Sequence, residues 1–77
     1  MTLQILWGHA ALAGLYALHP WDGMRVDRAV IRFAQRREGH VERLGPHRRL
    51  TVGPLRVIFT VVPETDTMNV LYVYRLR

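Results

Sequence analysis

Hydrophobic positions near the start of the chain recur at the spacing of an α-helix. They predict a helix from about His9 to Leu18, preceded by a short strand over residues 2–7. The helix is expected to end before Pro20, because the residue that precedes a proline avoids helical backbone angles. The same apolar run has the length of a signal peptide, but no lysine or arginine precedes it. We therefore interpret it as a core helix, and no segment reaches the length of a membrane span.

A second amphipathic pattern follows directly. Its apolar positions have i, i+3, i+4, i+7 and i+8 spacing and comprise Val26, Ala29, Val30, Phe33 and Ala34. This helix is expected to begin at Trp21 or Asp22, since an acidic side chain favours a helix N-terminus, and to stop at Gly39. Its polar side carries Arg25, Arg28, Arg32 and Arg36, which form either a solvated face or a surface that meets a target.

The second half of the chain alternates apolar and polar residues, as half-buried strands do. Three strands are predicted, over residues 48–52, 55–62 and 68–75. A two-residue turn of type II′ joins the first pair, and Gly53 supplies the positive φ that its first position requires. The resulting order β-α-α-β-β-β is an α+β fold, in which two N-terminal helices pack on a small antiparallel sheet. We expect residues 1–77 to form a single domain.

Turn lengths predict how these strands pair and which side chains share a face. The first turn places Thr51 opposite Arg56, and a loop over residues 64–67 places Arg56 opposite Arg75. The face toward the helices is then expected to hold Leu50, Val52, Leu55, Val57, Phe59, Val61, Val70, Tyr72 and Tyr74. The other face is expected to hold Arg49, Thr51, Arg56, Ile58, Thr60, Leu71, Val73 and Arg75. A slip of one residue in the second hairpin would move Arg75 to the opposite face.

Charge adds a chemical preference to this sheet. The chain has 11 basic residues, all of them arginine, against 6 acidic residues. Arginine binds phosphate and carboxylate groups bidentately, so the excess indicates a polyanionic target or an acidic partner, unless it reflects a GC-rich genome. Arg49, Arg56 and Arg75 are predicted to gather on the face without helices. Spacing alone favours an Arg56 that merely faces solvent there, whereas the interleaved Ile58, Leu71 and Val73 favour a binding surface. Histidines are scattered and cysteine is absent, so we expect neither a metal nor a cofactor.

The strands also carry a family resemblance. "RLTVGPLRVIF" (residues 49–59) and "ETDTMNVLYVYR" (residues 64–75) resemble the RelE/ParE toxins of type II toxin–antitoxin modules, whose typical pattern is R-L-R-V-G-x-Y-R-V-I-F, an acidic turn, then V-L-x-V-x-x-R. A short strand that ends in Trp7, two helices and a glycine before "VERL" agree in order. The resemblance implies a cytoplasmic toxin, not bound to a membrane, that a cognate antitoxin neutralises.

In the RelE branch, the resemblance implies ribosome-dependent mRNA cleavage and translation repression, with Arg56 at the scissile phosphate and Arg49 and Arg75 as further catalytic residues. Thr51 departs from the pattern, because an arginine is usual there. The late tyrosine of the family is missing, and both tyrosines of the last strand are expected on the helix side, so no general base is evident. Whether the chain is an enzyme therefore stays open. The alternatives are a ParE-like inhibitor of DNA gyrase and a degenerate module that only binds an antitoxin or nucleic acid.

Overall fold

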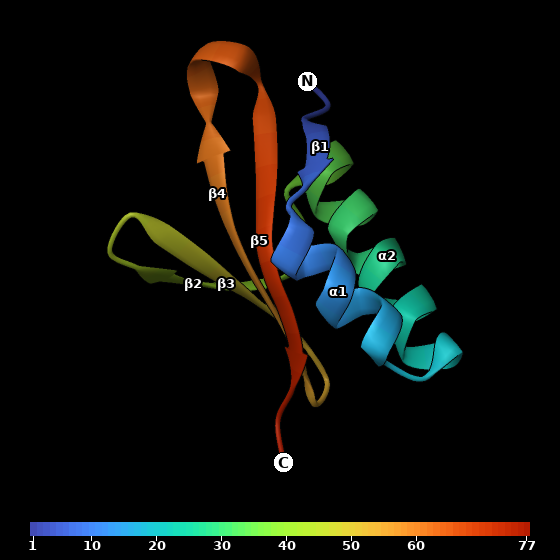
Figure 1. Ribbon diagram of the computed structural model, residues 1–77. Helices are drawn as coiled ribbons and strands as arrows, with labels where there is room; N and C mark the ends of the chain where they lie inside the picture. Colours follow the sequence, from blue (N-terminus) through green and yellow to red (C-terminus); the bar gives the residue numbers. More distant parts are fainter.

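Two helices cover one face of a five-stranded sheet in the computed structural model, which describes residues 1–77 (Figure 1). The elements are β1 (Gln4–Trp7), α1 (His9–Ala17), α2 (Pro20–Arg36), β2 (His40–Leu44), β3 (His47–Val52), β4 (Leu55–Val62), the 3₁₀ turn η1 (Pro63–Thr65) and β5 (Thr67–Arg75). The strand order across the sheet is β1-β5-β4-β3-β2. The predicted α+β class, with two helices packed on a small sheet, is confirmed. Neither helix is long and apolar enough to cross a membrane.

Helix α2 begins and ends on side chains that satisfy its free backbone groups. Nδ1 of His19 accepts a hydrogen bond from the backbone N–H of Trp21 at 3.2 Å, so a histidine caps the N-terminus. The predicted stop at Gly39 is wrong, because Arg37 already adopts the left-handed conformation with φ 58°. Its guanidinium donates to the carbonyl of Ala34 at 2.6 Å. Arg37 thus satisfies a terminal carbonyl that a glycine would leave to water.

The sheet extends beyond the predicted three-stranded meander at both edges. Residues His40–Leu44 form β2, an antiparallel partner of β3, where a loop was expected. Only Val41 of this strand is even half-buried, so β2 lacks the apolar alternation by which strands are recognised. At the other edge, β1 pairs with β5 in parallel, which makes the sheet mixed rather than antiparallel. This pairing joins segments at opposite ends of the chain, and no local pattern encodes it.

The register of the first hairpin is confirmed, and that of the second is wrong. Val52 pairs with Leu55 around Gly53, whose φ is 58°. In the second hairpin, η1 takes up Pro63, which has no N–H for a ladder, so that Phe59 pairs with Val70, two residues before its predicted partner Tyr72. A β-bulge at Ile58/Phe59, in which Leu71 has no partner on β4, reverses one of these two residues of slip.

Beyond the bulge, the net result is a slip of one residue, which turns the end of β5 over. Residues 72–75 therefore lie on the faces opposite to those predicted. Val73 is 4% exposed and packs in the core, where an outward position was expected.

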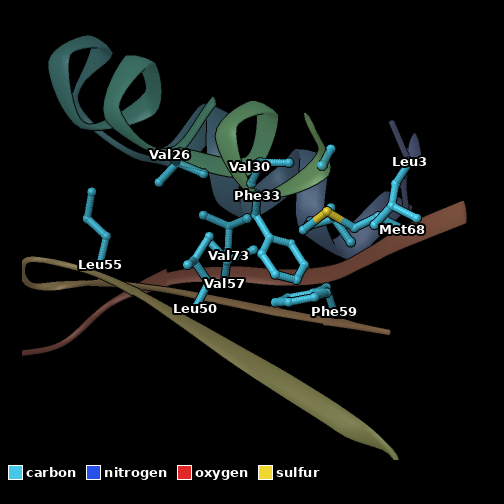
Figure 2. Close-up of a cluster of buried hydrophobic side chains, with 13 residues drawn as sticks. Leu3, Val26, Val30, Phe33, Leu50, Leu55, Val57, Phe59, Met68 and Val73 are labelled. Carbon is cyan, nitrogen blue, oxygen red and sulfur yellow. The ribbon is translucent and has the colours of Figure 1, made fainter. Parts of the chain in front are cut away.

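The core fills the space between the helices and the sheet (Figure 2). Figure 2 shows Phe33 pointing from α2 toward Phe59 on β4, and their ring centroids lie 4.9 Å apart. The 13 core residues are Leu3, Ala11, Val26, Val30, Phe33, Ala34, Leu50, Leu55, Val57, Phe59, Met68, Val70 and Val73. Helix α1 lies close to β5 at Gly14, where a Cβ atom would overlap the backbone carbonyl of Val73. The missing side chain therefore fixes the position of α1 on the strand.

Candidate functional site

The sheet face without helices, here called the open face, carries two rows of side chains across four strands. The registers place His40, Thr51, Arg56 and Tyr74 in the first row and Glu42, Arg49, Ile58 and Tyr72 in the second. The strand neighbours of these residues, such as Leu50, Val57 and Val73, are buried under the helices. Residues directly opposite each other in a sheet have Cβ atoms about 5 Å apart, so each row forms a continuous surface.

Arg56 is held by the backbone of its own turn. Its Nη1 donates to the carbonyl of Gly53 at 2.7 Å and to that of Leu55 at 2.9 Å. No carboxylate pairs with Arg56, and neither Nε nor Nη2 has a hydrogen-bond partner in the protein. The Nε–Nη2 edge is the one that takes a phosphate side-on in a bidentate contact. The turn therefore fixes Arg56 and leaves its phosphate-binding edge free.

Arg49 lies on the same face but, unlike Arg56, is paired with a carboxylate. Its Nη2 donates to Oε2 of Glu42 at 3.0 Å, and the Arg49 side chain is 32% exposed. Its Nε is buried without a hydrogen-bond partner. The neighbouring carboxylate offsets the charge of Arg49, so Arg56 is the one arginine of the open face without an acidic partner.

The two tyrosines of β5 lie on the open face, which corrects their predicted place under the helices. The single-residue slip beyond the bulge turns them outward, and Tyr72 and Tyr74 are 55% and 38% exposed. Tyr74 lies directly opposite Arg56, so the open face carries a tyrosine on the strand position that neighbours this arginine. Sequence reasoning missed this pair. The available signal was the sequence Tyr-Val-Tyr, in which two amphipathic side chains flank a small apolar one.

Arg75 lies on the helix side of the sheet, not with Arg49 and Arg56 as predicted. It pairs with Leu55 across the sheet, and its Nη1 donates to Oδ2 of Asp22 on α2 at 2.7 Å. The same carboxylate lies 3.6 Å from Nη1 of Arg25. The slip in register is again the cause, because it turns every side chain beyond the bulge over. The structure thus brings together two of the three predicted site arginines.

Histidines do not gather at any one place. His19 caps α2, and His40 occupies the β2 end of the first row on the open face. No group of three or more His, Cys, Asp or Glu side chains is arranged to hold a metal ion. The chemistry of the open face therefore has to be argued from its arginine, hydroxyl and carboxylate groups.

No family model and no curated protein matches the sequence at a significant level. Solved structures do match the fold. The isolated RelE toxin of E. coli superposes with a TM-score of 0.80 at 10% identity, covering 97% of this chain and 85% of that chain. A chain of the archaeal RelE–RelB complex from Pyrococcus horikoshii OT3 gives 0.77 at 20% identity, covering 97% and 96%. The chromosomal ParDE toxin–antitoxin system of P. aeruginosa gives 0.64 at 16% identity, covering 99% and 98%. The chain thus shares its fold, two helices on a mixed five-stranded sheet, with these RelE and ParDE structures.

Proposed function

We propose that the chain is the toxin of a type II toxin–antitoxin module and that it arrests growth by cleaving mRNA on the ribosome. The observation that carries this proposal is the pairing of Arg56, which has no acidic partner, with Tyr74 in one row of the open face. The fold supports it, since the TM-score is higher with the RelE toxin of E. coli (0.80) than with the ParDE system (0.64).

The first row suits the chemistry of RNA cleavage by the ribose 2′-hydroxyl. In that reaction the 2′-oxygen loses a proton and bonds to phosphorus, the bond from phosphorus to the 5′-oxygen breaks, and the leaving 5′-oxygen gains a proton. The free edge of Arg56 would stabilise the negative charge that grows on the phosphate. The hydroxyl of Tyr74 would carry one of the two proton transfers, and Thr51 on the other side of Arg56 offers a hydroxyl for positioning.

The second row suits the unpaired bases that flank a cleaved phosphate. Ile58 and Tyr72 are neighbours across β4 and β5, and the ring of Tyr72 is largely exposed. Proteins recognise single-stranded RNA by stacking its bases on aromatic side chains, worth about 1–3 kcal/mol per base. We assign Arg49 to a flanking phosphate in this row, where the carboxylate of Glu42 limits its net charge. The open face thus combines a stacking platform with a phosphate-binding edge.

The same face fits an antitoxin. An acidic amphipathic segment would bury Ile58 and the two tyrosines and would give Arg56 the carboxylate partner that it lacks. A stable complex of this kind buries about 800 Å² on each partner. An antitoxin placed there would block the functional residues directly.

Inhibition of DNA gyrase is the second candidate. Two observations favour it: Thr51 stands where the RelE-like pattern has an arginine, and Glu42 offsets Arg49. Both reduce the positive charge that a phosphate would meet on the open face. The first function breaks messenger RNA and the second lowers DNA supercoiling, so measurements in cells can separate them.

Induced expression of the chain is expected to stop growth, and co-expression of an antitoxin encoded beside it is expected to restore growth. If translation is the target, total RNA from arrested cells should show broken messages within minutes while plasmid supercoiling stays normal. Loss of supercoiling with intact messages would instead identify gyrase. Normal growth of cells that accumulate the folded chain would contradict a toxin and leave a binding module.

Arg75→Ala is expected to leave growth arrest unchanged and to lower the free energy of unfolding by less than about 1 kcal/mol, because it removes one half-exposed ion pair with Asp22. Thermal melting and a growth assay measure the two effects. Arg77→Ala, at the exposed end of the chain, is the matched control. A folded Arg75→Ala chain that no longer arrests growth would return Arg75 to the functional site.

A further inference from the structure

The outward surface of α2 carries a second cluster of arginines, remote from the open face. Arg28, Arg32 and Arg36 are exposed at intervals of four residues, and with Ile31 and Gln35 they line a shallow groove of about 320 Å³. The buried residues of α2 occupy the other side of the same helix. Figure 1 shows α2 on the helix-covered side of the sheet. Because this α2 arginine groove lies on the side of α2 opposite to its buried residues, it faces away from the sheet and from the open face.

None of the three groove arginines has an acidic partner. The chain's ion pairs engage Asp22 with Arg25 and Arg75, and Glu42 with Arg49. Like charges at i and i+4 destabilise a helix by about 0.2–0.5 kcal/mol per pair, and α2 contains two such pairs in the groove. The sequence retains this repulsion in a helix whose two ends are capped by His19 and Arg37. A polyanionic ligand would remove it.

The groove's shape and lining favour a particular polyanion. Eight residues of helix span about 12 Å, and a nucleic-acid strand presents one phosphate per about 3.4 Å of helix axis, so the three arginines match a run of about three phosphates. The lining contains no aromatic side chain, in contrast to the open face with its two exposed tyrosines. The groove therefore lacks the aromatic platform on which successive unpaired bases stack.

We propose that the α2 arginine groove binds the sugar–phosphate backbone of a nucleic-acid duplex without reading its sequence. Arginines make bidentate contacts with phosphate oxygens, and the amide of Gln35 can donate to a phosphate or exchange hydrogen bonds with a ribose 2′-hydroxyl. The chain then has two nucleic-acid surfaces on opposite sides, one for a single strand and one for a duplex. Duplex binding by this groove does not require that the chain be a toxin.

The test measures the affinity of the purified chain for a labelled duplex of about 16 base pairs, in RNA and in DNA of the same sequence, at several salt concentrations. The variant Arg28→Gln/Arg32→Gln/Arg36→Gln removes the groove charges. The control variant Arg43→Gln/Arg48→Gln/Arg77→Gln removes three arginines elsewhere, so both variants change the formal net charge from +5 to +2, since 5 − 3 = 2. Thermal melting confirms that each variant is folded.

The groove variant is expected to lose at least tenfold in affinity for the duplex at 0.1 M salt, and the slope of log K against log salt should fall in magnitude by about 0.9 for each arginine removed. The control variant should keep most of the affinity for the duplex and most of the salt slope. Tighter binding of RNA than of DNA would assign the ligand as RNA through its 2′-hydroxyls, and equal binding would assign backbone phosphate alone. Equal losses in the two variants, or no duplex binding by the unmodified chain, would overturn the proposal. Growth arrest is measured separately, so the duplex-binding results do not decide whether the chain is a toxin.

Discussion

Arg56→Ala is expected to abolish growth arrest while the chain stays folded. The guanidinium is the one cation of the open face without an acidic partner, and two hydrogen bonds from its Nη1 to the turn leave the Nε–Nη2 edge without a partner in the protein. Removing one donor from a site that stabilises a developing negative charge costs about 10²–10³ in rate. The side chain is half-buried and fills no part of the core, so we expect the free energy of unfolding to fall by less than about 1 kcal/mol.

A growth assay, the rate of message cleavage and a thermal melt together check this expectation. Arg56→Lys keeps the charge but loses the planar fork, so it should recover only a small part of the activity. Arg43→Ala, an exposed arginine of β2 outside the two rows, is the matched control and should behave like the unmodified chain. Full growth arrest by a folded Arg56→Ala chain would remove Arg56 from the site. An unfolded one would show that its hydrogen bonds to the turn are structural.

Alanine at two helical glycines is expected to change stability in opposite directions. At Gly14 on α1, a Cβ atom would overlap the carbonyl of Val73, which is backbone and cannot rotate away. The helix would have to move off β5, at a cost of about 1–3 kcal/mol or more. At Gly23 on α2, a Cβ atom would meet the carbonyl of Leu15 at 3.8 Å, an ordinary contact. Gly23→Ala should therefore stabilise the chain by about 0.5–1 kcal/mol, because alanine favours the helix.

Thermal denaturation of the two variants beside the unmodified chain measures both changes. For a domain of this size, 1 kcal/mol corresponds to a shift of about 4–8 °C in Tm, so the two melting curves should lie on opposite sides of the reference curve. Because Val73 separates the two tyrosines of the open face, Gly14→Ala should also reduce growth arrest. A Gly14→Ala chain as stable as the reference would contradict the close approach of α1 to β5.

Local patterns were sufficient for the helices and for the first hairpin. The stripe on α2 and the glycine turn at Gly53 each rest on neighbours in the sequence, and the structure confirms both. Strand β2 escaped prediction because His40–Leu44 has almost no buried side. The parallel pairing of β1 with β5 escaped because it joins the two ends of the chain. Contacts of that kind depend on the whole fold and leave little trace in a short window of sequence.

The candidate site was half predictable for the same reason. Arg49 and Arg56 were placed correctly because they follow directly from the turn at Gly53. Arg75 and Tyr74 were exchanged between the faces because a proline-initiated turn and one bulge together shift the register of β5. A single-residue slip thus removed an arginine from the predicted site and supplied the hydroxyl group that it lacked.

Message cleavage in a purified translation reaction tests the central claim most directly. Ribosomes stalled on a defined mRNA are mixed with the chain, and the 5′ ends of the RNA are mapped. The account predicts breaks that require both the ribosome and the chain, that disappear with Arg56→Ala and that slow at least tenfold with Tyr74→Phe, which keeps the ring and removes only the hydroxyl. Intact message in the presence of a folded chain that arrests growth in cells would contradict the account.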